Sequence, residues 1–114
     1  MRLIGWTGER GIRFVVDESF VDFVNEEDTL LREEILAAYP HLIVIKSISK
    51  SYGVPGLRLG VLASWDQELT GKVKAGLPVW NINSFGEYFL QIFENIWMIT
   101  AIPWRNLGRR GSVL

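Results

Sequence analysis

Cysteine is absent from the 114 residues, and histidine occurs only once, as His41. The missing cysteines exclude disulfide bonds, thiolate catalysis and zinc sites built on cysteine. His41 directly follows Pro40, between an expected helix and an expected strand. We therefore expect it to be a surface loop residue rather than a metal ligand, and we predict no metal site.

An excess of charge of either sign is also lacking. Twelve basic and 13 acidic residues give a net charge of -1, which provides no electrostatic basis for binding nucleic acid or an anionic membrane. No apolar run approaches the roughly 20 residues of a membrane span, and the apolar start at residues 1–5 is too short for a signal peptide. We expect a soluble, cytoplasmic protein without a nucleic-acid or membrane partner.

Short apolar runs alternate with amphipathic segments along the chain. Apolar runs at residues 13–16, 42–45 and 58–63 predict three strands, and their continuous rather than alternating pattern predicts that both faces of the sheet are covered. A helix is expected over residues 26–39, ending before Pro40. The order strand, helix, strand predicts an α/β fold with a sheet that is at least partly parallel.

Two later helices carry signals for their N-terminal ends. Ser64 with Gln67, and Ser84 with Glu87, have the spacing of a capping box. The second of these helices, over residues 85–97, carries an apolar stripe that we expect to be buried in the core.

Ionisable and hydroxyl side chains follow two of the predicted strands, where ligands bind in open α/β sheets. The first strand ends at Asp17, and the second is followed by Ser47, Ser49 and Lys50. Arg58, further along the same turn, has a planar guanidinium suited to phosphate. These residue types predict an anion site that contains a lysine. A polar surface turn is the other interpretation that they allow, and the two common glycine-rich nucleotide motifs are absent.

The segment SISKSYGVPGLRLG, residues 47–60, resembles the lysine segment of fold-type I pyridoxal-phosphate enzymes of aminotransferase class I/II. VVDESFVDF, residues 15–23, resembles the acidic strand end of the same family, and the order and separation of the two segments also fit. The resemblance implies a partial doubly wound, mainly parallel sheet from the family's large domain. Residues 1–96 would be a partial cofactor-binding domain, and residues 97–114 a poorly matched tail.

The resemblance also implies a role for each candidate site residue. Lys50 would form the Schiff base with pyridoxal 5'-phosphate, and Asp17 would pair with the pyridine nitrogen. Arg58 would hold the phosphate, together with Ser49 and Ser47. A carboxylate beside the ring nitrogen keeps the nitrogen protonated, and the protonated ring is the stronger electron sink.

Phe20 stands where many family members have a tyrosine that hydrogen-bonds the cofactor. This form resembles the branch of histidinol-phosphate aminotransferases and threonine-phosphate decarboxylases, nearer the latter. Other segments are similar to aminotransferase-like domains fused to nucleotidyltransferases. Transamination and decarboxylation both stay open, with an amino acid or an amino-acid phosphate as substrate. The roles of Phe20 and Asn81 stay open as well.

Members of this family are several hundred residues long. We therefore expect the chain to be incomplete and inactive alone, and family sites at dimer interfaces make a homodimer a possible assembly. Two alternatives to an aminotransferase follow. One is a decarboxylase of the threonine-phosphate type, and the other is a non-catalytic module that binds phosphate or packs against another chain.

Overall fold

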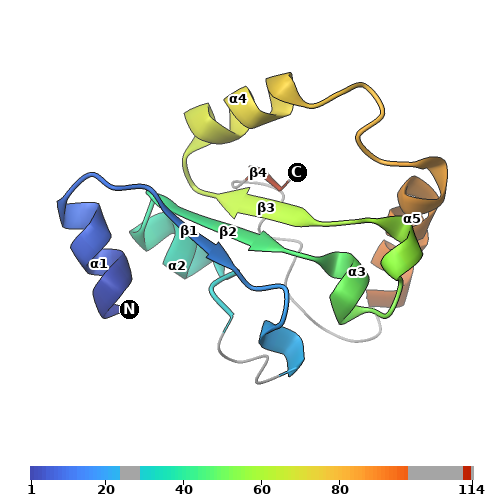
Figure 1. The fold of residues 1–114 in the computed structure, drawn as a ribbon, viewed down its shortest axis with the longest axis horizontal. Helices are drawn as coiled ribbons and strands as arrows, with labels where there is room; N and C mark the ends of the chain where they lie inside the picture. The colour runs from blue at the N-terminus through green and yellow to red at the C-terminus, as the bar shows by residue number, and fades with distance from the viewer. Residues whose placement is uncertain (24–28, 98–111, 114) are drawn as a thin grey trace.

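The computed structural model describes residues 1–23, 29–97 and 112–113 (Figure 1). Its helices (α), 3₁₀ helices (η) and strands (β) are, in sequence order, α1 (Arg2–Glu9), β1 (Phe14–Asp17), η1 (Val21–Phe23), α2 (Glu33–Ala38), β2 (Leu42–Lys46), α3 (Ile48–Ser51), η3 (Pro55–Leu57), β3 (Val61–Ser64), α4 (Gln67–Gly76), α5 (Ser84–Trp97) and β4 (Ser112–Val113). The three expected strands are confirmed, with ends that differ by up to three residues.

The four strands form one sheet in the order β1-β2-β3-β4. β1 and β2 are parallel, with Asp17 opposite Ile45. β3 runs antiparallel to β2, and β4 runs antiparallel to β3. A parallel return needs a crossover of a dozen or more residues, usually a long helix, whereas only the short α3 and η3 separate β2 from β3. The α/β class is confirmed, and the described sheet is mixed, with its parallel part at β1 and β2.

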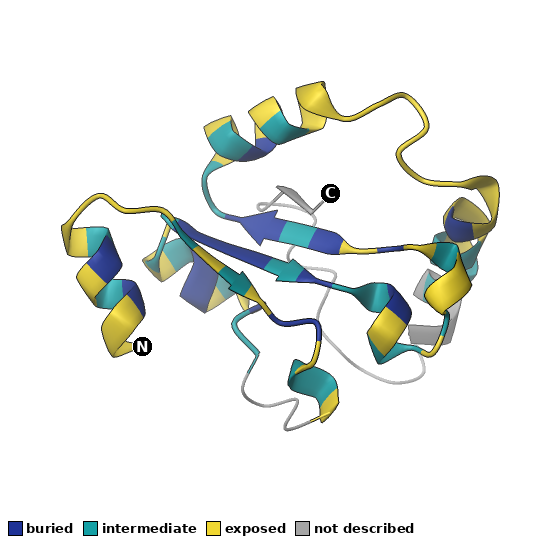
Figure 2. Cartoon of the chain, in the orientation of Figure 1, coloured by how far each residue is buried: buried dark blue, intermediate teal, exposed yellow. Residues whose placement is uncertain are grey.

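The core lies on one face of this sheet (Figure 2). Leu42 and Val44 of β2 are fully buried there against Leu36 of α2, and Ile4 of α1 joins the same cluster. The opposite face is only partly covered, since Val15 of β1 is 55% exposed. The expectation that both faces are covered therefore holds for β2 but is wrong for β1, whose side chains alternate between partly buried and exposed.

Helix α1 was not expected from the sequence, and His41 attaches it to the sheet. The Nε2 atom of His41 lies 2.8 Å from the carbonyl oxygen of Ile4 and 3.3 Å from the hydroxyl of Thr7. A Cβ atom on Gly8 would come within 2.5 Å of the His41 ring, so the helix can pack this closely only with glycine there. His41 lies in a turn, as expected, but it is partly buried and forms a packing contact between α1 and the sheet.

Helix α2 begins at Glu33, later than the expected start at residue 26. Glu18 explains the difference for the described part of this segment. Its carboxylate accepts hydrogen bonds from the Thr29 hydroxyl at 2.7 Å and from the Leu30 backbone N–H at 2.6 Å. These contacts hold the backbone in an irregular path up to Arg32, whose extended conformation precedes the helix. Residues 26–28 of the expected helix lie outside the described residues.

For both later helices, the sequence predicted the wrong capping residue. Asp66 caps α4 by accepting the Leu69 N–H at 3.0 Å. The Ser64 hydroxyl instead donates a hydrogen bond to the Leu42 carbonyl of β2. For α5, the Asn83 side chain accepts the Gly86 N–H at 2.9 Å. In each helix the cap is the residue directly before the first helical residue, as the geometry of a helix end requires.

The apolar stripe of α5 is only partly buried. Phe85 and Tyr88 are 79% and 62% exposed, so the expectation of a core stripe was wrong for the first turns of the helix. Further along, the Phe93 ring packs 4.9 Å from the ring of Tyr52, and Phe89 and Ile92 are partly buried. The side chain of Ile96 is not among those that the structure describes. Across the described segments, no helix is long and apolar enough to cross a membrane.

Candidate active site

Asp17 lies at the carboxyl end of β1, next to the end of the parallel strand β2. Its Oδ1 atom accepts the backbone N–H of Ser19 at 2.9 Å. The Ser19 hydroxyl and this N–H, with a smaller contribution from the charge of Lys50, hold the pKa of Asp17 below its ordinary value of 3.8, against a modest opposing effect of burial. The carboxylate is therefore ionised at neutral pH.

Lys50 is carried by α3, which begins directly after the N-cap residue Ser47. The side chain is exposed, and its Nζ atom lies 4.4 Å from the centroid of the Phe20 ring. Since Phe20 follows β1 and Lys50 follows β2, the parallel pair brings both to the same end of the sheet. The structure thus brings Asp17 and Lys50 to the same end of the sheet, as expected, and places Phe20 beside Lys50.

Arg58 has the only positive φ angle among the described non-glycine residues, with φ 55° and ψ 40°. This left-handed conformation is uncommon for a residue with a long side chain, and such strain gathers at functional sites. No carboxylate forms an ion pair with Arg58 in the part of the chain that the structure describes. Within the described residues, its guanidinium is therefore not balanced by a carboxylate.

The two candidate serines differ in what their hydroxyls contact. Ser49 is 2% exposed, and its hydroxyl accepts the Leu59 N–H at 2.7 Å and donates to the Leu59 carbonyl at 3.2 Å. This pair of bonds fastens the turn that carries Arg58 to Ser49. Ser47 is partly buried, and its hydroxyl makes no hydrogen bond to another described residue. Of the two hydroxyls, that of Ser47 is available to a ligand.

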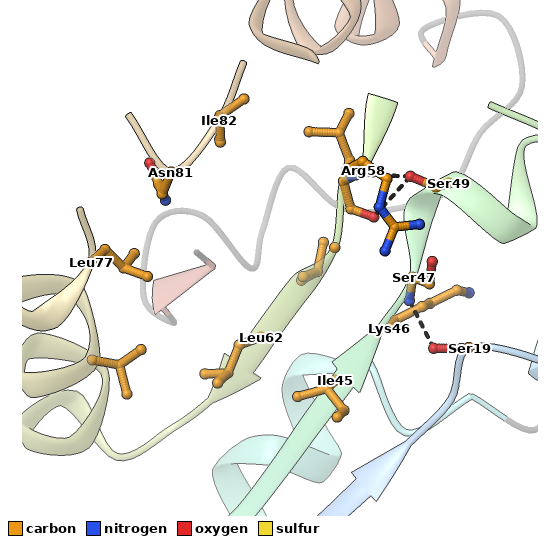
Figure 3. Close-up of a pocket in the computed structure, with 14 residues that line it drawn as sticks. Ser19, Ile45, Lys46, Ser47, Ser49, Arg58, Leu62, Leu77, Asn81 and Ile82 are labelled. Carbon is orange, nitrogen blue, oxygen red and sulfur yellow. Dashed lines mark hydrogen bonds between the residues drawn. The ribbon is translucent and has the colours of Figure 1, made fainter. Parts of the chain in front are cut away.

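A cavity of about 480 Å³ lies beside these residues (Figure 3). Arg58, Ser47 and Ser49 line one end, and Leu77 and Ile82 lie across the cavity from them. A polar, cationic end opposite an apolar wall suits a ligand with an anionic group on an apolar or aromatic body. Lys50 and Asp17 lie outside the lining of this cavity, beside its polar end.

Sequence reasoning missed two residues next to this site. Ser19 lines the cavity and is almost completely buried. Lys46, also buried, forms an ion pair with Asp22 at 2.5 Å. The signal available for Ser19 was its place between Asp17 and Phe20 in the acidic motif, whereas nothing in the sequence pattern marks Lys46 as buried. Asn81, whose role the sequence left open, lines the cavity.

Comparison with known proteins places these features in context. Residues 2–91 match the model of the family described as aminotransferase class I and II. A CMP-5'-(3-aminopropyl)phosphonate synthase of Streptomyces rubellomurinus is 43% identical over 84 residues, covering 74% of this chain and 13% of that protein. An L-serine phosphate decarboxylase of Sulfurospirillum multivorans is 38% identical over 84 residues, covering 71% and 21%.

A threonine-phosphate decarboxylase of Salmonella typhimurium is 32% identical over 104 residues, covering 87% of this chain and 28% of that protein. The crystal structure of a histidinol-phosphate aminotransferase from Clostridium acetobutylicum superposes with a TM-score of 0.68 at 26% identity, over 77% of this chain and 26% of that chain. The chain therefore spans less than a third of the length of each of these relatives.

Proposed function

Because this chain belongs to the aminotransferase class I and II family, we propose that it is the pyridoxal-phosphate-binding part of an enzyme acting on an amino acid or an amino-acid phosphate. One observation carries the proposal: the parallel ends of β1 and β2 bring the ionised carboxylate of Asp17 near the exposed amine of Lys50, while Arg58 lines a cavity together with Ser47 and Ser49, which directly precede Lys50 or lie close to it in sequence. The reaction itself is proposed for the longer protein, with the 114-residue chain inactive alone.

The residues present fit the two ends of the cofactor. Arg58 has no carboxylate partner in the described segments, so its planar guanidinium is available to the phosphate. Ser47 adds a hydroxyl at the same end of the cavity. Ser49 contributes by shaping the turn, because its own hydroxyl is bonded to the Leu59 backbone. Asp17, which is ionised and lies near Lys50, has the negative charge that a protonated ring nitrogen needs as its partner.

The bound cofactor supplies an electron sink for negative charge that develops at the substrate's α-carbon. The chain's own groups serve this chemistry in distinct ways. Asp17 holds a proton on the ring nitrogen, because a nearby negative charge favours the protonated form. Lys50 would hold the cofactor by condensing with its aldehyde group, with loss of water, and the same amine, when free, would move a proton at the α-carbon.

Reductive labelling tests the proposal on the chain as it stands. The protein is incubated with pyridoxal phosphate, the product is reduced with borohydride, and the modified lysines are identified by peptide mapping. We expect Lys50 to be labelled in preference to Lys72 and Lys74, two lysines of α4. A formed site should also produce an absorbance band in the visible range. Equal labelling of the three lysines would contradict the proposal and leave a non-catalytic module as the better interpretation.

Two variants of Arg58 separate its charge from its backbone strain. Arg58→Ala removes the guanidinium and keeps a side chain at a left-handed position, whereas Arg58→Gly removes it and relieves the strain. A charged hydrogen bond of the kind expected here contributes enough that both variants should lower Lys50 labelling by about tenfold. Lys72 labelling should not change in either. If Arg58→Gly kept full labelling, the phosphate role of Arg58 would be wrong.

A decarboxylase is the second candidate, and Phe20 is the residue that favours it. Phe20 offers no hydroxyl to the cofactor, and two relatives are named L-serine phosphate decarboxylase and threonine-phosphate decarboxylase. The two reactions differ in their products, since decarboxylation releases carbon dioxide and transamination transfers the amino group to a keto acid. Product analysis of a longer protein that contains this chain, supplied with an amino-acid phosphate, separates the two. A homodimer likewise stays a proposal for that protein.

A further inference from the structure

Ser19 is buried between the two strand ends that carry the candidate site. It is 6% exposed, and its backbone N–H donates to Oδ1 of Asp17 at 2.9 Å. Its Oγ atom accepts the backbone N–H of Ser47 at 3.1 Å. Figure 3 shows the second of these bonds, between the residues that follow β1 and β2. Ser19 thus contacts both segments of the site at once.

The hydroxyl can make a further bond because it has one proton as well as acceptor sites. Its acceptor side is used by the Ser47 N–H, and the Ser19 side chain is the largest cause of the lowered pKa of Asp17, followed by the Ser19 backbone N–H. Ser19 therefore binds the Asp17 carboxylate through its backbone N–H and the Ser47 N–H through its hydroxyl, so one residue connects the two segments.

The hydrogen bonds of Ser19 lie just beyond the point where the pairing of β1 with β2 ends. The backbone pairing of the two strands reaches its end at the bond from the Glu18 N–H to the Ile45 carbonyl, at 2.8 Å. The Ser19–Ser47 bond continues the connection beyond that point, through a side chain. Ser47 is the N-cap residue of α3, and Lys50 lies on that helix.

We propose that Ser19 is a positioning residue, which joins Asp17 to the start of α3 through its backbone N–H and its hydroxyl and so sets the place of the carboxylate relative to Lys50. This inference deepens the proposed function, on which it rests. The charged groups around Asp17 do not provide the same link. Lys50 is exposed and contacts Phe20, Glu18 is bonded to Thr29 and Leu30, and Lys46 is paired with Asp22.

The first experiment measures Asp17 without any cofactor. The pKa of its carboxyl group is followed by carbon-13 NMR in the wild-type chain and in three variants. In Ser19→Ala we expect the pKa of Asp17 to rise, because only the backbone N–H remains as a donor. Ser19→Thr retains a hydroxyl and should keep the pKa low. An unchanged pKa in Ser19→Ala contradicts the inference.

Ser51→Ala is the matched control. The Ser51 hydroxyl donates to the Ser47 carbonyl at 3.2 Å, so it binds the same residue from within α3 without contacting Asp17. Its removal should leave the pKa of Asp17 as it is in the wild type. The wild-type titration also stands by itself if Ser19→Ala does not fold. A wild-type Asp17 with a pKa at or above 3.8 would overturn the inference.

The second readout is reductive labelling of Lys50 with pyridoxal phosphate. One hydrogen bond of ordinary net strength corresponds to about a fivefold change in binding, so Ser19→Ala should lower Lys50 labelling by about that factor. Ser19→Thr should restore it, and Lys72 labelling should stay constant. Failure of Lys50 labelling in the wild-type chain contradicts the proposed function. Unchanged labelling in Ser19→Ala, beside selective labelling in the wild type, contradicts only the positioning role.

Discussion

The amine of Lys50 lies over the face of the Phe20 ring, with 4.4 Å between Nζ and the ring centroid. The two residues come from different strand ends and meet because β1 and β2 are parallel. A charged amine on a ring face is held by the electrostatic attraction between them, at exposed sites by about 0.5–1 kcal/mol. Phe20 is 63% exposed, so this contact forms at the surface of the site.

Removal of the ring should make Lys50 more reactive. In Phe20→Leu the amine no longer has to leave the ring face to reach an aldehyde, and we expect labelling by pyridoxal, which has no phosphate, to rise about two- to fivefold. Phe23→Leu is the control, because Phe23 packs 6.0 Å from the Phe20 ring and is similarly exposed. Equal labelling of Lys50 in the two variants would show that the ring contact has no effect on reactivity.

The ion pair of Lys46 and Asp22 should contribute to stability. Their side chains are 6% and 18% exposed, and Oδ2 of Asp22 is buried without a hydrogen bond to a described residue. Loss of one partner leaves a buried charge, so Lys46→Ala should lower the free energy of unfolding by about 3–5 kcal/mol. Chemical denaturation measures this change, and Asp22→Leu together with Lys46→Met should recover most of it.

The exposed pair of Lys72 and Glu68 on α4 is the comparison for that experiment. Its side chains are 72% and 78% exposed, and such pairs contribute about 0.3–0.5 kcal/mol. Lys72→Ala should therefore have little effect. A similar loss of stability in Lys46→Ala and Lys72→Ala would contradict the buried placement of Lys46.

Ser49 should matter more for folding than for the phosphate. Ser49→Ala leaves the buried Leu59 N–H without its partner and removes one of the two bonds to the Leu59 carbonyl, which keeps the Ser49 backbone N–H. We expect the free energy of unfolding to fall by about 1–3 kcal/mol. Ser47→Ala should have a smaller effect on stability but a larger one on Lys50 labelling in the folded chain. Denaturation measures the loss of stability and peptide mapping the loss of labelling. If Ser47→Ala lost more stability and Ser49→Ala lost more labelling, Ser49 rather than Ser47 would be the phosphate ligand.

Stability should fall in acid because two aspartates have lowered pKa values. Hydrogen bonds from Ser19 lower the pKa of Asp17, and the Leu69 N–H lowers that of Asp66. A lowered pKa in the folded state stabilises the fold above the ordinary value of 3.8, and this contribution is lost as the pH falls below it. The urea midpoint should therefore decrease between about pH 5 and pH 3.

Asp66→Asn identifies one source of this acid sensitivity. Asparagine caps a helix about as well as aspartate but does not titrate, so the variant should retain α4 and lose part of the decrease in acid. Circular dichroism follows the helix while the urea midpoint is measured. An unchanged decrease between the two pH values would mean that Asp66 does not contribute to it.

The local patterns of the sequence predicted the strands and most helices, because continuous apolar runs and the positions of proline report directly on local structure. They were less reliable where a distant side chain competes with the local preference. Glu18, by binding residues 29 and 30, delays the start of α2. Ser64 has the right spacing for a cap, but its hydroxyl donates to the Leu42 carbonyl of β2, and Asp66 caps α4 instead.

For the candidate site, residue types and spacing alone determined that a carboxylate and a lysine follow two neighbouring strands, and that an arginine follows them in a glycine-rich turn. Only the tertiary structure decided how these groups meet. Parallel pairing brings Asp17 to Lys50, and the antiparallel return of β3 bonds Leu59 to Ser49 and leaves Ser47 open to the cavity. Such contacts depend on strand direction and register, which are set by packing across the whole sheet rather than by any local segment.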